Sequence, residues 1–243
     1  MRRECATDPE LARALYNSGM PRHEPSMTDG VDFYFDYLSP YAYLAWIELR
    51  RHDPGFTLRP RPVLFAGLLD HHGQLGPAEI ESKRRFVFRD VTRRAIDAGV
   101  AVRPPVVHPF NPLAALRVSL ATVAGDAQLA VIDALFSATW MRAAPVDSVE
   151  AVARVLEEAG LDGQALAART AEDAVKTALR AETDAAIAQG VFGVPTFVVN
   201  EELFWGSDQL AYVKRAVEGR DPPAPLLRTP APPAGAVRRR GAK

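Results

Sequence analysis

Residues 31–44 read VDFYFDYLSPYAYL, and this stretch decides how the rest of the chain is interpreted. Residues 31–36 are rich in aromatic and β-branched side chains, which is typical of a short buried strand. Ser39 and Pro40 follow, and a serine N-cap before a proline at the first helical position predicts a helix start. We expect this helix to run to about Arg51. The pattern therefore places a hydroxyl group at the junction of a strand and a helix.

The rest of the chain extends this pattern on both sides of a long helical region. A second strand is expected over 56–64, where Pro60 and Pro62 favour an edge position or an early ending. Further helices are expected over 79–99, 112–124, 127–141, 148–159 and 162–189 (one or two elements), and strands over 196–199 and 203–205. Ser207 would then cap a last helix that ends near Gly219. This order predicts an α/β fold in which strands from both ends of the chain close one mixed sheet.

The composition is that of an ordinary globular protein. The 243 residues carry 29 Lys and Arg against 30 Asp and Glu, which argues against a protein built to neutralise nucleic-acid phosphates. The mean hydropathy is −0.09, and we expect no membrane span, because no uninterrupted apolar run approaches about 18 residues. The single cysteine, Cys5, excludes an internal disulfide and a two-cysteine redox site. With no paired cysteines and no secretory signal in residues 1–30, we expect a cytoplasmic protein.

Three short motifs can carry chemistry, and each also has a plain structural explanation. Ser39 lies where unpaired N–H groups and the helix dipole favour an anion such as a thiolate, but capping serines are common. Pro195, after the β-branched Val194, is a candidate for a cis peptide bond, although most such bonds are trans. Ser207 and Asp208 can hold the carboxylate and amine of an amino-acid head group, or can simply cap a helix.

Together these motifs resemble the 2-hydroxychromene-2-carboxylate isomerases, which belong with the kappa-class glutathione transferases in the DsbA-type thioredoxin-like family. The resemblance lies in residues 33–44 (FYFDYLSPYAYL), 190–197 (GVFGVPTF) and 204–208 (FWGSD), and it covers roughly residues 31–218. It implies a thioredoxin-like mixed sheet with a large all-helical insertion. DsbA-like oxidoreductases carry Cys-Pro-x-Cys in the first turn, whereas this chain has Ser39-Pro40-Tyr41-Ala42, so dithiol exchange at this site is excluded.

Composition at the two ends and the resemblance between them together predict a division of the chain. The expected parts are an N-terminal extension at 1–30, a thioredoxin-like domain at 31–65 and 190–219, an inserted helical domain at 66–189 and a Pro-rich basic tail at 220–243.

The resemblance further implies a glutathione site built from distant residues. Ser39 would hydrogen-bond the glutathione sulfur and favour its thiolate, and the backbone of Val194, before Pro195, would pair with the cysteinyl unit. Ser207 and Asp208 would hold the γ-glutamyl end. Other implied glutathione contacts are Tyr41, Lys83 and Gln74, the last of which stands where related enzymes have an asparagine.

The implied reaction is the cis–trans conversion of a hydroxychromene carboxylate to trans-o-hydroxybenzylidenepyruvate by reversible thiolate addition. We expect Trp205 to offer the aromatic substrate a stacking surface, and His108 and Asn111 to order its hydroxyl or carboxylate. The resemblance also implies a homodimer. A kappa-like transferase acting on another electrophilic aromatic, and a thioredoxin-like binding protein without turnover, remain as alternatives.

Other features favour weaker hypotheses. The basic stretch 83–94 has interleaved acidic residues, which is typical of a solvated, salt-bridged helix face rather than of a nucleic-acid contact. His71 and His72 suggest a metal, but no further ligands stand at the usual spacing, so no metal site is expected. A serine hydrolase is disfavoured because Pro40 would remove an oxyanion-hole N–H after Ser39.

Overall fold

The computed structural model describes residues 30–221. The expected N-terminal extension and basic tail therefore lie almost wholly outside the described residues.

A four-stranded mixed sheet forms the centre of the molecule, with strand order β2-β1-β3-β4. The strands are β1 (Val31–Phe35), β2 (Leu58–Pro62), β3 (Thr196–Val199) and β4 (Glu202–Trp205). β1 pairs with β2 in parallel and with β3 in antiparallel orientation, with Phe33 opposite Pro60 on one side and Phe197 on the other. Strands from the two ends of the described chain are therefore neighbours, which confirms the predicted mixed sheet.

β2 lies at the edge of the sheet, as its prolines predict. Val31 N–H donates to the Thr57 carbonyl and Val63 N–H donates to the Phe35 carbonyl, so the odd-numbered residues of β2 face β1. Pro60 and Pro62 consequently face outward, where no N–H is needed.

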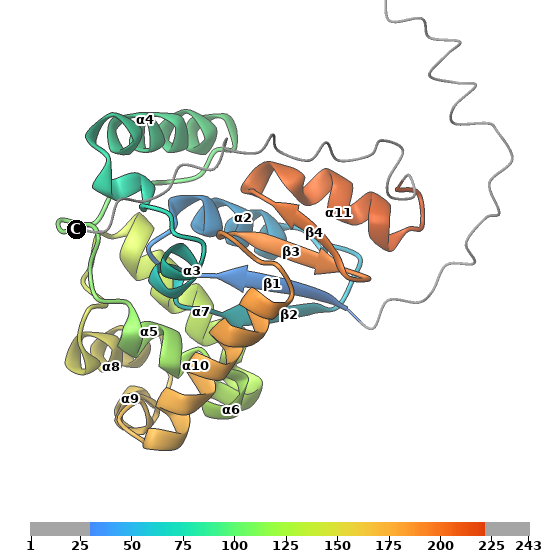
Figure 1. Cartoon of the computed structure of the whole chain (residues 1–243). Coiled ribbons are helices and arrows are strands. Elements are labelled where there is room, and N and C mark those ends of the chain that lie inside the picture. The colour runs from blue at the N-terminus through green and yellow to red at the C-terminus, as the bar shows by residue number, and fades with distance from the viewer. Residues whose placement is uncertain (1–29, 222–243) are drawn as a thin grey trace, which may run out of the picture.

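The helices surround this sheet unevenly. They are α2 (Pro40–Arg51), α3 (Phe65–His71), α4 (Glu81–Asp97), α5 (Leu113–Val118), α6 (Ala121–Ala124), α7 (Gln128–Phe136), α8 (Val149–Glu158), α9 (Gly163–Arg169), α10 (Asp173–Ala188) and α11 (Leu210–Val217). Short 3-10 turns lie at η1 (Pro77–Glu79), η2 (Gly125–Ala127) and η4 (Ser207–Gln209), and η3 (Ser137–Met141) is a π-helical turn. Figure 1 shows α5 to α9 grouped below the sheet, α10 running from that group to the sheet, and α4 lying apart at the top.

Several boundaries differ from the sequence predictions. The predicted helix at 112–124 is broken around Ser119 and Leu120, and the one at 127–141 ends in a π-helical turn. The region 162–189 forms two helices, and α3 was not predicted at all.

Alternate side chains of β1 enter two different cores, because successive residues of a strand point to opposite faces. Phe33 and Phe35 lie in the larger core with Trp46 of α2 and Phe136 of α7. Tyr34 lies in the smaller core, whose other members include Leu68 of α3, Ala186 of α10 and Val194. The insertion therefore covers the sheet as well as packing on itself.

One stretch within residues 30–221, Ala121–Met141, is long and apolar enough to cross a membrane by length and composition. Asp126 and Asp133 interrupt the stretch, so it passes on its mean hydropathy and not as an uninterrupted apolar run. Its large side chains Ile132, Leu135, Phe136 and Trp140 are fully buried, and we interpret the stretch as a core helix.

Candidate active site

Ser39 forms the N-cap of α2, as the sequence predicts. Its hydroxyl oxygen accepts a hydrogen bond from Ala42 N–H and donates one to the Val194 carbonyl, each at 3.2 Å. Within residues 30–221, the N–H of Tyr41 in the first turn makes no hydrogen bond. A nearly buried hydroxyl therefore lies beside the positive end of a helix and an unused backbone donor.

The Val194–Pro195 segment reaches Ser39 from 155 positions away in the chain. The peptide bond before Pro195 is cis, which confirms the interpretation of this motif. Thr196 Oγ1 donates to the Gly193 carbonyl at 2.7 Å, and this bond anchors the segment. The N–H of Val194 makes no hydrogen bond in the described part of the chain, so it is available to an extended ligand.

The Tyr37–Leu38 peptide group ahead of Ser39 is held at both ends. The ring N–H of Trp140, in the π-helical turn, donates to the Tyr37 carbonyl at 2.8 Å, and Leu38 N–H donates to the Asp36 carboxylate at 2.9 Å. Asp36 is fully buried, and its other carboxylate oxygen accepts from the N–H of Phe65, the first residue of α3. Burial raises the pKa of Asp36 to about 6, while the two N–H donors act to lower it.

The Leu38–Ser39 peptide group is held in the same way. His108 Nε2 lies 2.8 Å from the Leu38 carbonyl oxygen, and Ser39 N–H donates to the Asp36 carbonyl at 3.0 Å. His108 was expected to contact substrate, but its ring contacts the loop that carries Ser39.

The surroundings of His108 select one form of its ring. The ring makes edge contacts with Phe88 and Trp140, with centroids 5.5 and 5.7 Å away. Nδ1 is buried and has no hydrogen-bond partner within residues 30–221. Burial lowers the pKa of His108. A neutral ring with the proton on Nε2 is the form that satisfies the Leu38 carbonyl.

The Ser207 and Asp208 segment lies next to α2, but the prediction that Ser207 caps the last helix is wrong. Ser207 is the first residue of η4, its side chain makes no cap, and α11 begins only at Leu210. The reason is Gly206, whose φ of 121° redirects the chain. A Cβ at Gly206 would lie 2.5 Å from an Asp208 carboxylate oxygen, so Asp208 folds back over this glycine.

Tyr41 belongs to a charged cluster at the start of α2. Its hydroxyl donates to Asp90 of α4 at 2.9 Å, and Arg94 lies over its ring and pairs with Asp90 at 2.7 Å. Burial, with further contributions from Asp90 and Asp208, raises the pKa of Tyr41 to about 12. The Tyr41 hydroxyl is therefore protonated at neutral pH and committed to Asp90.

Trp205 forms an exposed aromatic surface beside the Pro195 segment. Its side chain is 55% exposed and meets Phe192 at a centroid distance of 5.0 Å. A Cβ at Gly193 would lie 2.8 Å from the Trp205 ring nitrogen, so the indole depends on glycine at that position. Phe192 was not singled out from the sequence, although it lies inside the GVFGVPTF motif that could have indicated it.

Three other candidate residues form no hydrogen bond with Ser39 within the described range. Asn111 is exposed, and its side chain accepts from Leu113 N–H at 3.1 Å at the start of α5. Lys83 is exposed on α4 and lines a shallow hollow with Pro77 and Phe86. Gln74 is exposed in the turn after α3.

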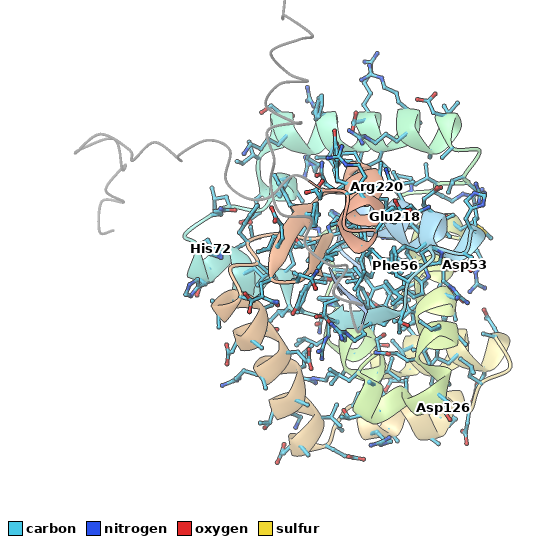
Figure 2. The ribbon with its side chains drawn as sticks, turned by 90° about the vertical axis from the view of Figure 1, so that its right-hand side faces the viewer. Asp53, Phe56, His72, Asp126, Glu218 and Arg220 are labelled. Atoms are coloured by element: carbon cyan, nitrogen blue, oxygen red, sulfur yellow. The ribbon has the colours of Figure 1, made fainter. Side chains whose placement is uncertain are left out.

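The described residues contain no cluster of three or more side chains able to hold a metal ion. His72 Nε2 donates to the Val191 carbonyl at 3.2 Å, in the segment ahead of Pro195. Figure 2 shows His72 on the opposite side of the molecule from Asp53, which follows the far end of α2.

On α4, Arg85 pairs with Glu81, as expected for a solvated face.

A family model for the DSBA-like thioredoxin domain matches residues 30–218. The chain is 31% identical over 193 residues to a 2-hydroxychromene-2-carboxylate isomerase from Pseudomonas putida, an alignment that covers 77% of this chain and 93% of that protein. It is 27% identical over 200 residues to glutathione S-transferase kappa 2 from Caenorhabditis elegans, with coverages of 75% and 89%.

A solved structure of a 2-hydroxychromene-2-carboxylate isomerase superposes with a TM-score of 0.68 at 28% identity, covering 77% of this chain and 94% of that one. These relatives support an isomerase-like or glutathione-transferase-like activity. The protein therefore belongs to the DsbA-like thioredoxin family, in which it is similar to 2-hydroxychromene-2-carboxylate isomerases and kappa-class glutathione transferases.

Proposed function

We propose that this protein is a glutathione-dependent isomerase that converts 2-hydroxychromene-2-carboxylate, or a related aromatic carboxylate, to the trans ring-opened product. The observation that carries this proposal is the Ser39 hydroxyl, which lies at a helix N-terminus and bonds the carbonyl that precedes cis-Pro195. The similarity to isomerases of that name supports the same assignment.

The donors of the site fit glutathione. The N–H groups of Tyr41 and Val194 make no hydrogen bond in the described residues and suit a short extended peptide. Asp208 forms no ion pair within residues 30–221, because the nearby Arg94 pairs with Asp90 instead, so the Asp208 carboxylate is available to the amine of the peptide. Since the first turn of α2 has no cysteine, a thiol has to come from a bound molecule.

When bound, glutathione would supply a thiolate for reversible addition to a conjugated double bond, which allows rotation about that bond. A thiol of ordinary pKa, about 8.5, is only about 3% thiolate at pH 7. Lowering that pKa by roughly two units needs about 2.7 kcal/mol. One hydroxyl hydrogen bond and one helix N-terminus together are of that size.

Ser39 supplies the hydroxyl. In the structure its proton is donated to the Val194 carbonyl, so rotation of the side chain away from that carbonyl frees the proton for a sulfur anion. The Ala42 N–H that now bonds Ser39 Oγ would keep the serine oxygen in place during this rotation. Ser39 therefore acts by binding and stabilising charge, not by attacking the substrate.

A kappa-like transferase acting on another electrophilic aromatic is the second candidate. The observation that favours it is the openness of the Trp205 and Phe192 surface, which is half-exposed and imposes little shape on a ligand. Both candidates require the same thiolate site at Ser39.

The test is the absorbance change of 2-hydroxychromene-2-carboxylate with the purified protein, with and without glutathione. Turnover only with glutathione is expected. Equal turnover without it contradicts the cofactor, and saturable glutathione binding by calorimetry without turnover favours the transferase. If neither glutathione binding nor turnover is detected, the result favours a thioredoxin-like binding protein.

A further inference from the structure

The loop ahead of Ser39 is bonded on opposite sides by two different parts of the chain. Within the loop, Asp36 accepts from Leu38 N–H and Ser39 N–H. From the helical insertion, the rings of Trp140 and His108 reach the carbonyls of Tyr37 and Leu38. Both peptide groups are thereby fixed at their N–H and C=O ends, and neither can turn without breaking two hydrogen bonds.

The orientation of the Leu38 carbonyl matters for a thiolate site. This carbonyl belongs to the residue directly before Ser39, so covalent geometry keeps its oxygen within a few ångströms of the Ser39 side chain. A carbonyl oxygen that faced a bound sulfur anion would repel it and oppose the N–H groups of the first helical turn. The 2.8 Å contact to His108 commits that oxygen to a ring donor instead.

We propose that His108 is a positioning residue of this site, which holds the Leu38 carbonyl away from the bound sulfur by donating Nε2–H to it. The effect on the thiolate rests on the proposed glutathione-dependent function, whereas the fixing of the loop does not.

The packing around the ring supports this role. Unlike the Trp140 ring, the His108 ring has a second nitrogen, Nδ1. This atom is buried and has no hydrogen-bond partner in residues 30–221. If the ring only filled the space between Phe88 and Trp140, an apolar side chain would be more stable at this position, because an unpaired buried polar atom costs free energy. The one hydrogen bond that repays this cost is the bond to Leu38.

The test uses three substitutions that separate shape from hydrogen bonding. In His108→Gln the side-chain amide nitrogen can reach the place of Nε2, whereas in His108→Asn it reaches only the place of Nδ1. His108→Phe keeps a ring of similar size but has no donor. Thermal melting shows whether each variant is folded, and Gln and Asn keep the comparison valid if Phe does not fold.

The first readout is amide hydrogen exchange at Ser39, measured by NMR without glutathione. We expect exchange about tenfold faster in the Asn and Phe variants and close to wild type in Gln, which is the effect of one hydrogen bond. The second readout is the ultraviolet absorbance of the bound glutathione thiolate as a function of pH. We expect the thiol pKa to rise by about one unit in Asn and Phe and to stay unchanged in Gln.

Two results would overturn the proposal. One is wild-type exchange at Ser39 in a folded His108→Phe variant. The other is a Gln variant as impaired as Phe while both melt at the wild-type temperature. If the wild-type protein gives no thiolate absorbance with glutathione, the proposed function fails, and the exchange rates alone then decide whether His108 fixes the loop.

Discussion

The thioredoxin-like part of the chain and its helical insertion contribute different kinds of groups to the site. The first supplies groups that can meet a ligand directly, among them Ser39, Val194 and Asp208. The second supplies His108 and Trp140, whose ring N–H groups meet backbone carbonyls of the loop before Ser39. The helical insertion therefore fixes the shape of the loop before Ser39, although it holds none of the groups proposed to act on the sulfur.

The largest difference is expected between two serine caps, one in each region. Ser39 Oγ accepts from Ala42 N–H at 3.2 Å, and Ser148 Oγ accepts from Ala151 N–H at 3.2 Å at the start of α8. Ser39→Ala and Ser148→Ala should each cost about 1 kcal/mol of stability, as lost caps do. Only Ser39→Ala should lower turnover, by about 10-fold to 100-fold, because it removes the hydroxyl hydrogen bond to the sulfur anion. Wild-type turnover of Ser39→Ala at saturating glutathione would refute its role.

The second prediction concerns Asp36 of the thioredoxin-like part, whose carboxylate accepts from the N–H groups of Leu38 and Phe65. Its pKa in the folded protein is raised to about 6 from the ordinary 3.8, so its contribution to stability is greatest below about pH 4 and is lost as pH rises through about 6. The loss amounts to about 3 kcal/mol. Asp36→Asn cannot titrate, so the stability of wild type relative to this variant should fall by that amount between about pH 4 and pH 7. Urea unfolding at both pH values measures it, and a difference that stays constant would contradict the assignment.

The third prediction compares two fully buried tryptophans. Trp140 of the insertion donates to the Tyr37 carbonyl at 2.8 Å, and Trp46 of α2 donates to Asp133 at 2.7 Å. Replacement of either by Phe should cost about 1–3 kcal/mol of stability. We expect only Trp140→Phe to lower kcat, by about tenfold, because only Trp140 holds the loop. Equal kinetics for the two variants would remove the insertion from the site.

The smallest effect is expected at the exposed aromatic surface. Trp205→Leu should raise KM for the aromatic substrate about fivefold, the size of one ring-stacking contact, and leave the glutathione affinity unchanged. Tyr212→Leu, at another exposed aromatic residue, serves as the control. A substrate KM that is unaffected by Trp205→Leu would place the substrate elsewhere.

The parts of the fold that local chemistry determines were predictable from sequence. Alternating large side chains specify β1, and Ser39 with Pro40 specifies the start of α2. α3 was missed because its first N–H, that of Phe65, is satisfied by the distant Asp36 and not by a local cap. The π-helical turn at η3 was missed for a different reason, because the apolar periodicity of the preceding helix continues through it.

The site divides along the same line. Its motif residues were identifiable because each lies at a strand end or helix start that the sequence marks. The contacts of His108 with Leu38 and of Trp140 with Tyr37 join positions 70 and 103 residues apart, and no local pattern indicates such pairs. Prediction from sequence therefore identified the groups proposed to meet the ligand and missed the contacts that hold them.

The outward prolines of β2 also bear on how this protein behaves in a crowded solution. A free strand edge is a template on which a second chain can add by backbone pairing, and this is a common start of aggregation. Pro60 and Pro62 offer no N–H donor on that edge, and Gln128 occupies the Pro60 carbonyl with a 3.2 Å hydrogen bond. The edge thus offers an incoming strand fewer groups to bond, and replacement of both prolines by residues with an N–H would favour association of chains there.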